Sequence, residues 1–159
     1  MRDFLERARW LAALTRRTGA QLAVNGRLDV ALLVGAHLHL PVDGPRPAEV
    51  RALLPAERWI SAAVHSEEEL RAARGADALL VSPVHAPGSK AADARPPLGA
   101  EGFRRLASAA APVPCYALGG MTADRARDLP GLAGVAVQSA ILRSADPSAT
   151  ARDLLQAVR

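Results

Sequence analysis

The sequence predicts an α/β protein built on a parallel sheet. Short, nearly unbroken apolar runs of four to six residues alternate along the whole chain with segments of helical pattern. Helices cover both faces of a parallel sheet, so its strands read as continuous apolar stretches rather than as alternating ones. The expected strands are Gln21–Val24, His37–Leu40, Trp59–Val64, Ala78–Val81, Val113–Leu118 and Gly134–Val137.

Helices are expected before the first run and after each of the six. The opening helix runs from Asp3, as its cap, to Thr18, and Gly19 ends it. Ser66 to Glu69 has the pattern of a capping box, in which a serine side chain and a glutamate three residues later satisfy the first free amides. Further helix starts are expected at Leu98–Glu101, Thr122–Asp124 and Asp146-Pro147.

Two architectures fit this βα repeat, and the residues alone leave both open. Six strands are two short of a closed (βα)8 barrel, and the 159 residues are fewer than the ~250 typical of one. An open doubly wound sheet suits the length better. However, the turn after the first strand, Asn25-Gly26-Arg27, lacks the glycine fingerprint expected of a dinucleotide-binding sheet.

Composition indicates a single domain of residues 1–159 with a core of Ala, Leu and Val, since half the residues are hydrophobic and 3% are aromatic. The net charge of +4 comes from scattered arginines without interleaved aromatic residues, so no nucleic-acid surface is expected. No apolar run approaches the ~20 residues that cross a membrane.

Cys115, the lone cysteine, lies in an apolar run and is expected to be a buried structural thiol. The absence of an internal disulfide and of a signal-peptide pattern predicts a cytoplasmic protein.

Polar residues or glycines stand where each strand is expected to end, which is where function gathers in barrels. Gly119-Gly120 and Gln138-Ser139 follow two successive strands and open helices. Two such turns can aim backbone N–H groups at one phosphate. Tight turns without a ligand would show the same residues, so both interpretations stand at this point.

Three features concern charged or titratable side chains. His65 ends a strand beside a capped helix and is a candidate for proton transfer, the alternative being a structural hydrogen bond. His37 and His39 share one face of a strand, but no third ligand accompanies them, so no metal site is expected. Lys90 is the only lysine, against nineteen arginines, and its loop after the fourth strand suits either contact with an anionic substrate or plain solvation. His85, in the same loop, is expected to be solvated.

Six segments match family motifs in the same order along the chain. They are Val24–Ala31 ("INDRxDLA"), Gly35–Leu40 ("GADGVHLG"), Ser61–Glu69 ("GxSxHxxEE"), Ser82–Gly99 ("GPIFPTxTKxxxPPLG"), Ala117–Met121 ("AIGGI") and Gly134–Ile141 ("GVAVxSAI"). Together they resemble the thiamine phosphate synthase/TenI family of (βα)8 barrels, over nearly the whole chain. The long loop with its PPLG ending is the most specific of the six.

The resemblance implies a thiamine-biosynthesis protein that binds a thiazole phosphate. The synthase joins a pyrimidine diphosphate to this thiazole and releases pyrophosphate, whereas TenI moves a proton to aromatise the thiazole ring. By position, the resemblance implies that His65 is the tautomerase acid/base and that Asn25 contacts substrate. It also implies that Ser89 and Lys90 meet the diphosphate, and that the thiazole phosphate is held by Gly119, Gly120, Gln138 and Ser139.

The chain departs from the family pattern in two ways. Gly26 stands where the resemblance implies an aspartate that binds Mg²⁺, and Asp43, the only other candidate ligand, is out of register by one residue. Mg²⁺ is therefore doubtful, and no other cofactor is expected. The chain also begins at what resembles the family's second helix, without the first strand, first helix and second strand, the last of which carries pyrophosphate-gripping residues.

These departures lead to the prediction of a truncated TIM-barrel type with about six of eight βα units, expected to be a homo-oligomer. Thiazole tautomerisation is favoured over coupling. The alternatives are a thiamine phosphate synthase and a non-catalytic binding remnant of the barrel.

Overall fold

The structure, a computed structural model, describes residues 2–86, 95–129 and 131–159. Its centre is a sheet of six parallel strands in the sequential order β1-β2-β3-β4-β5-β6. The strands are β1 (Ala23–Asn25), β2 (His37–Leu40), β3 (Ile60–Val64), β4 (Ala78–Val81), β5 (Cys115–Leu118) and β6 (Gly134–Ala136).

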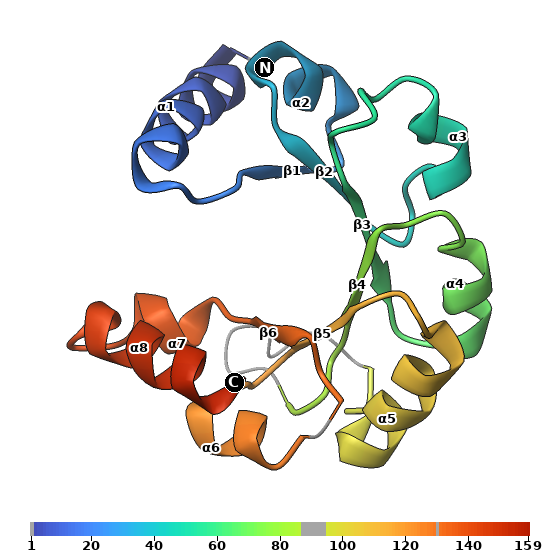
Figure 1. The fold of residues 1–159 in the computed structure, drawn as a ribbon, viewed down its shortest axis with the longest axis vertical. Coiled ribbons are helices and arrows are strands. Elements are labelled where there is room, and N and C mark those ends of the chain that lie inside the picture. Colours follow the sequence, from blue (N-terminus) through green and yellow to red (C-terminus); the bar gives the residue numbers. More distant parts are fainter. Residues whose placement is uncertain (1, 87–94, 130) are drawn as a thin grey trace.

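The strand order decides between the two architectures. A doubly wound sheet reverses its order at a switch point, and there helices cross to the other face. Here each strand pairs with the next one along the chain, so every crossover continues in the same direction. The sheet curls, with the helices on its outer side (Figure 1). The predicted barrel type with six strands is thereby confirmed, and the open doubly wound sheet is wrong.

Eight helices surround the described part of the sheet. They are α1 (Arg2–Thr18), α2 (Leu28–Val34), α3 (Pro47–Arg51), α4 (Glu67–Ala72), α5 (Gly99–Ala110), α6 (Ala123–Arg127), α7 (Ser139–Leu142) and α8 (Pro147–Ala157). Three predicted caps are present, since Ser66, Thr122 and Asp146 each accept the amide three residues later. Asp3 lies inside the first turn of α1 rather than before it.

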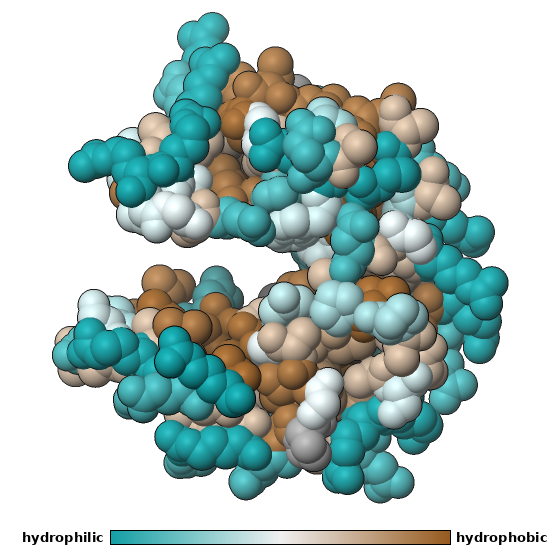
Figure 2. Space-filling model, viewed as in Figure 1, coloured by the Kyte–Doolittle hydropathy of each residue, from teal (hydrophilic) through white to brown (hydrophobic). Residues whose placement is uncertain are grey.

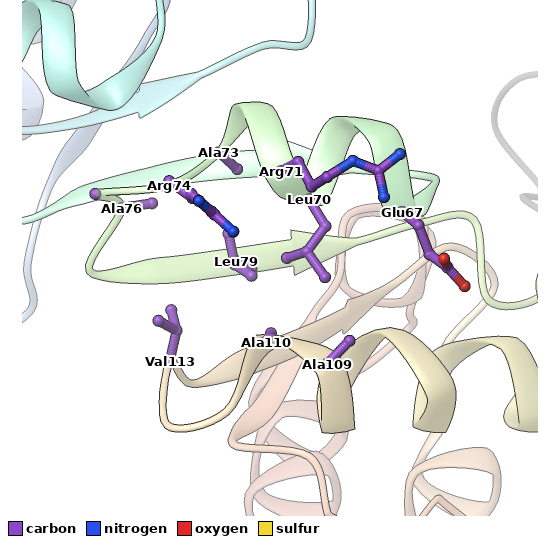
Figure 3. A pocket seen from close by; sticks show the side chains of 11 residues that line it. Glu67, Leu70, Arg71, Ala73, Arg74, Ala76, Leu79, Ala109, Ala110 and Val113 are labelled. Atoms are coloured by element: carbon purple, nitrogen blue, oxygen red, sulfur yellow. The ribbon is translucent and has the colours of Figure 1, made fainter.

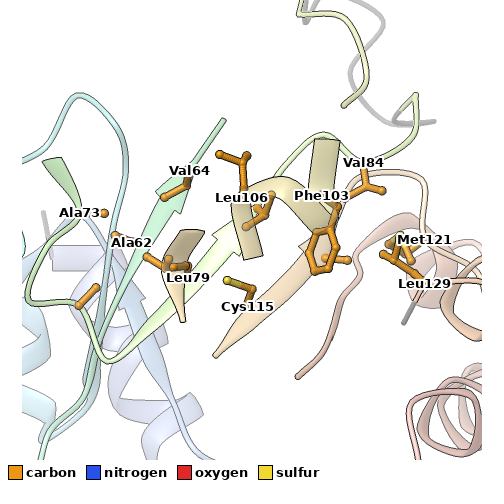
Figure 4. Packing of buried hydrophobic residues seen from close by; sticks show 14 of the residues in the cluster. Ala62, Val64, Ala73, Leu79, Val84, Phe103, Leu106, Cys115, Met121 and Leu129 are labelled. Atoms are coloured by element: carbon orange, nitrogen blue, oxygen red, sulfur yellow. The ribbon is translucent and has the colours of Figure 1, made fainter. Parts of the chain in front are cut away.

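The core lies between the outer face of the sheet and the helices. Alternate strand residues face outward, and they form two buried clusters. One cluster joins β1, β2 and Ile60 to α1 and α2, and the other joins Ala62 and Val64 to β4, β5 and α5. Phe103 of α5 is fully buried in the second cluster (Figure 4). Cys115 is 3% exposed there and burial raises the pKa of its thiol, so the predicted burial is confirmed.

The inner face of the sheet carries the other set of alternate residues. Near the start of β2, His37 stacks on Trp59 with ring centroids 4.3 Å apart. Figure 2 shows the molecule hollowed between α1 on one side and α7 and α8 on the other, with hydrophobic residues gathered along the hollow. In the described part of the chain, β1 and β6 each pair with one neighbour only, so both leave an unpaired edge. No described helix is long and apolar enough to cross a membrane.

Candidate functional site

A cavity of about 560 Å³ lies where the strands end. Every strand contributes to its wall, either through its last residues or through the residues that follow it. The cavity brings together all of the predicted site residues that the structure describes, namely Asn25, Asp43, His65, Gly119, Gly120, Gln138 and Ser139. Ser89 and Lys90, predicted to meet a diphosphate, lie outside the described residues.

The glycine turn after β5 forms one wall of this cavity. Gly119 and Gly120 have φ angles of +99° and +57°, a region that favours glycine. The loop that follows β4 crosses directly over them, because the amide of His85 donates to the Gly119 carbonyl at 3.1 Å. A Cβ on Gly120 would lie 2.6 Å from the carbonyl oxygen of Ala86. Both the backbone conformation and the close packing therefore require glycine here, whether or not a ligand binds.

The same turn offers free backbone donors. Within the described residues, the amides of Gly120 and Met121 donate to no backbone carbonyl, nor do those of Ser139 and Ala140 at the start of α7. All four residues line the cavity. The Arg125 guanidinium donates to the Gly120 carbonyl and so braces the turn from outside. Successive N–H groups at two neighbouring turns are an arrangement that accepts an anion.

The exposure of His85 differs from the prediction. It is half-buried against the glycine turn rather than solvated. Burial lowers the pKa of its imidazole, and the nearby Arg125 lowers it further. Its backbone amide helps to join the β4 and β5 exits.

His65 is held by Glu69 at the cavity wall. Its Nδ1 lies 2.8 Å from Glu69 Oε2, and the same oxygen accepts the His65 backbone amide at 2.6 Å. The side chain is 12% exposed. A carboxylate only accepts hydrogen bonds, so Nδ1 carries the proton in the neutral ring and Nε2 is left as an acceptor. His65 therefore has the arrangement of a base with its orienting carboxylate.

A second polar pair was missed by the sequence analysis. His39 lines the cavity from β2, and its Nδ1 lies 2.8 Å from the Oγ of Ser61 on β3. Burial lowers the pKa of His39. The pair is 22 residues apart in sequence, and its only signal was that both residues fall on the inner face of neighbouring strands.

The two candidate magnesium positions, Gly26 and Asp43, supply a single carboxylate between them. Asp43 is exposed at the cavity mouth, and Gly26 supplies no carboxylate, its amide donating to the His39 carbonyl at 2.9 Å. His37 is engaged elsewhere, since its Nδ1 accepts the Trp59 amide at 3.0 Å. No group of three His, Cys, Asp or Glu side chains in the described part of the chain comes together as a metal site.

A second cavity, of about 340 Å³, lies in the outer layer between α4 and α5 (Figure 3). Its wall includes the start of β4 and Val113 before β5, so it lies away from the strand exits. Leu70, Ala73 and Ala110 line it, with Arg71 and Arg74 above. Its wall carries Glu67, Arg71, Arg74 and the turn at Gly75 but none of the predicted site residues, and the cavity at the strand exits is therefore the candidate site.

The comparisons with known proteins agree with the motifs. The family model described as thiamine monophosphate synthase matches residues 1–141. The chain is 45% identical, over 96% of its length, to a thiamine-phosphate synthase of Solidesulfovibrio magneticus, of which it covers 74%. It is 42% identical over 98% of its length to the bifunctional ThiM/ThiE protein of Symbiobacterium thermophilum, and spans 33% of that protein.

Solved structures give the same result. A thiamine phosphate pyrophosphorylase from Pyrococcus furiosus matches with a TM-score of 0.84 and 30% identity, covering 99% of this chain and 76% of that one. A 3-hexulose-6-phosphate synthase matches with a TM-score of 0.68 at 18% identity, over 96% of this chain and 81% of that one, and shows a shared fold alone. The motifs, the fold and these matches agree that the chain belongs to the thiamine monophosphate synthase family.

Proposed function

We propose that this protein binds a thiazole phosphate of thiamine biosynthesis and transfers a proton on its ring. The observation that carries the proposal is that the His65–Glu69 pair faces the same cavity as the two donor turns. The cavity thus places a proton-transfer group and an anion site around one small molecule.

The phosphate end of the ligand would lie against the two turns. The amides of Gly120, Met121, Ser139 and Ala140 are the donors, and the guanidinium-bearing Arg95 also lines the cavity. Charge-assisted hydrogen bonds from several amides to one phosphate are stronger than neutral ones, so this end would anchor the ligand. The ring would then extend toward β1–β3, where His65 lies.

The chemistry at His65 is an isomerisation by proton transfer. Its Nε2 accepts a proton from one ring position of the thiazole and returns it to another, so that no group is lost or gained. Glu69 stabilises the imidazolium formed between the two steps, because its carboxylate already accepts Nδ1–H. The proposed proton transfer uses His65 and Glu69 and has no step that calls for a metal.

The second candidate function is the synthase reaction. The observation that favours it is the similarity of the chain to relatives that are thiamine-phosphate synthases. The phosphate turns would serve a thiazole phosphate equally well in that reaction. Coupling also requires a positive site for the departing diphosphate, and of the two predicted contacts, Ser89 and Lys90, neither belongs to the described residues.

Two variants of Ser139, one charged and one neutral, test the phosphate site. Ser139 is the first residue of α7, a position where a carboxylate is favourable to the helix. Ser139→Asp should therefore keep the fold, but should abolish binding of thiazole phosphate in calorimetry by like-charge repulsion. Ser139→Asn, the neutral control of the same shape, should retain binding. Equal affinities of the two variants would contradict the proposal.

Two assays on the unaltered chain then separate the reactions. One follows isomerisation of the thiazole phosphate, and the other follows release of pyrophosphate with the pyrimidine diphosphate and Mg²⁺ added. Isomerisation alone supports the first candidate. Pyrophosphate release that requires both substrates supports the second.

A further inference from the structure

His39 and Ser61 form a polar pair that neither the phosphate site nor the proton transfer uses. The strand registers align Asn25 of β1 with His39 of β2, and His39 with Ser61 of β3, on the inner face of the sheet. His39 is half-buried and lines the cavity. Ser61 is 3% exposed and is not among the residues that line the cavity, so it contacts His39 on the side away from the cavity.

The direction of their hydrogen bond follows from burial. A hydroxyl has one hydrogen to donate, and a buried donor left without an acceptor is costly. Among the described residues, the acceptor that Ser61 Oγ reaches is His39 Nδ1, at 2.8 Å. The Ser61 hydroxyl therefore donates to Nδ1, and the ring proton of His39 sits on Nε2. Burial lowers the pKa of His39 below its usual value, which favours the neutral ring at pH 7.5.

We propose that His39 is a ligand-binding residue that donates its Nε2–H to an uncharged acceptor on the ring of the ligand, and that Ser61 is the positioning residue that fixes this tautomer. The two cavity histidines then have opposite roles, since Glu69 leaves His65 Nε2 as an acceptor whereas Ser61 makes His39 Nε2 a donor. The matching ligand is a phosphate ester whose heterocyclic ring carries an unprotonated nitrogen or an oxygen. The identity of the ligand rests on the proposed function, but the tautomer of His39 does not.

Imidazole ¹⁵N NMR spectroscopy on the full chain tests the tautomer directly. At pH 7.5 His39 should be neutral with hydrogen on Nε2 and an unprotonated Nδ1, and its signals are assigned from their loss in His39→Gln. Ser61→Ala should mix the tautomers. Ser144→Ala is the matched control, because that hydroxyl pairs with Thr150 outside the cavity at 2.7 Å, and it should change nothing. A ring of His39 protonated on Nδ1, or one unaffected by Ser61→Ala, would overturn the assignment.

Calorimetry with two probes tests the binding role. His39→Leu should lower the affinity for thiazole phosphate by about three- to tenfold, which is the contribution of one neutral hydrogen bond. The affinity for inorganic phosphate should be unchanged. His39→Gln, which keeps an N–H donor, should lose less. An equal loss for both probes, or none, would overturn the binding role. If the unaltered chain binds no thiazole phosphate, the proposed function and this binding role fail together, while the NMR result still decides the tautomer.

Discussion

One carboxylate oxygen of Glu69 accepts both the ring Nδ1–H of His65, at 2.8 Å, and its backbone amide, at 2.6 Å. Glu69 belongs to α4 and its own amide donates to Ser66. One residue, Glu69, thus connects the helix start, through its amide, with the backbone at the end of β3 and the imidazole, through its side chain. The orientation of His65 in the cavity is therefore set by the local fold before any ligand arrives.

His65→Ala should lower the rate of thiazole isomerisation by about 10²–10⁴-fold, the usual worth of general acid–base catalysis. Glu69→Gln should cause a smaller fall in kcat and a changed pH–rate profile, because an amide can still accept a hydrogen bond but stabilises the imidazolium less. Glu67→Gln is the control on the same helix, since Glu67 pairs with Arg105 outside the cavity. Full activity of His65→Ala would refute the role of this histidine.

Gly120→Ala should destabilise the chain more than Gly19→Ala does. Both glycines have positive φ, and a side chain at such a position costs about 1–2 kcal/mol. A Cβ on Gly19 would meet nothing within 4 Å, whereas one on Gly120 would also press on the Ala86 carbonyl. Urea unfolding of the two variants measures the difference. Equal losses would show that the loop gives way freely, and Gly120 variants would then test ligand binding without disturbing the fold.

Mg²⁺ should bind the free protein weakly, and Gly26→Asp should strengthen it. Gly26 has a φ of +68°, which Asp and Asn tolerate better than other side chains, and a Cβ there makes only ordinary contacts with Pro41 at 3.7 Å. The new carboxylate would join Asp43, and Mg²⁺ sites commonly use one or two carboxylates. Gly26→Asn is the uncharged control. Tight binding of Mg²⁺ by the unaltered chain in calorimetry would contradict the expectation that the site lacks a second carboxylate ligand.

Stability should fall as the pH drops below about 6.5. Burial lowers the pKa of His37, His39 and His85 in the folded chain, whereas in the unfolded chain each returns to about 6.5. The unfolded state then binds more protons, so this contribution is complete above pH 6.5 and is lost as the pH falls toward the lower folded values. Urea unfolding between pH 7.5 and 5 measures the slope. His37→Gln, which can still accept the Trp59 amide, should reduce it.

The isolated 159-residue chain should self-associate or unfold at modest temperature. In the described sheet, β1 and β6 each leave one edge unpaired, and such edges pair readily with another chain. Large apolar residues are also exposed, among them Trp10 of α1 at 66% and Leu142 of α7 at 75%. Light scattering over a range of concentrations checks this. A monomer with a sharp melt at high temperature would show that the open edges are well tolerated.

Local patterns predicted most of the fold. The runs His37–Leu40 and Ala78–Val81 are strands with the expected bounds, because buried parallel strands need continuous apolar residues. The run Val113–Leu118 was too long by two residues, since the strand begins at Cys115, directly after Pro114. Gln138-Ser139 was expected to open a helix, and α7 begins there, but it ends after four residues and the separate helix α8 follows it.

The rest of the site depends on spatial neighbours. Ser61 and His39 meet only because β2 and β3 pair in one particular register, which no local pattern specifies. Glu69 was expected to reach the Ser66 amide in a capping box, but its side chain reaches one residue further back, to His65. The capping-box pattern identifies Glu69 as the side chain that turns back toward the helix start. Which backbone amide this side chain accepts from depends on how the helix packs on the sheet.

The two hydrophobic clusters meet within a single strand, β3, whose Ile60 belongs to one and whose Ala62 and Val64 belong to the other. Because each strand pairs only with its neighbours in sequence, the chain resembles a linear array in which cooperativity passes from unit to unit. The segments on either side of β3 can then open as separate foldons. Amide hydrogen exchange should be slowest along β3 and progressively faster toward β1 and β6.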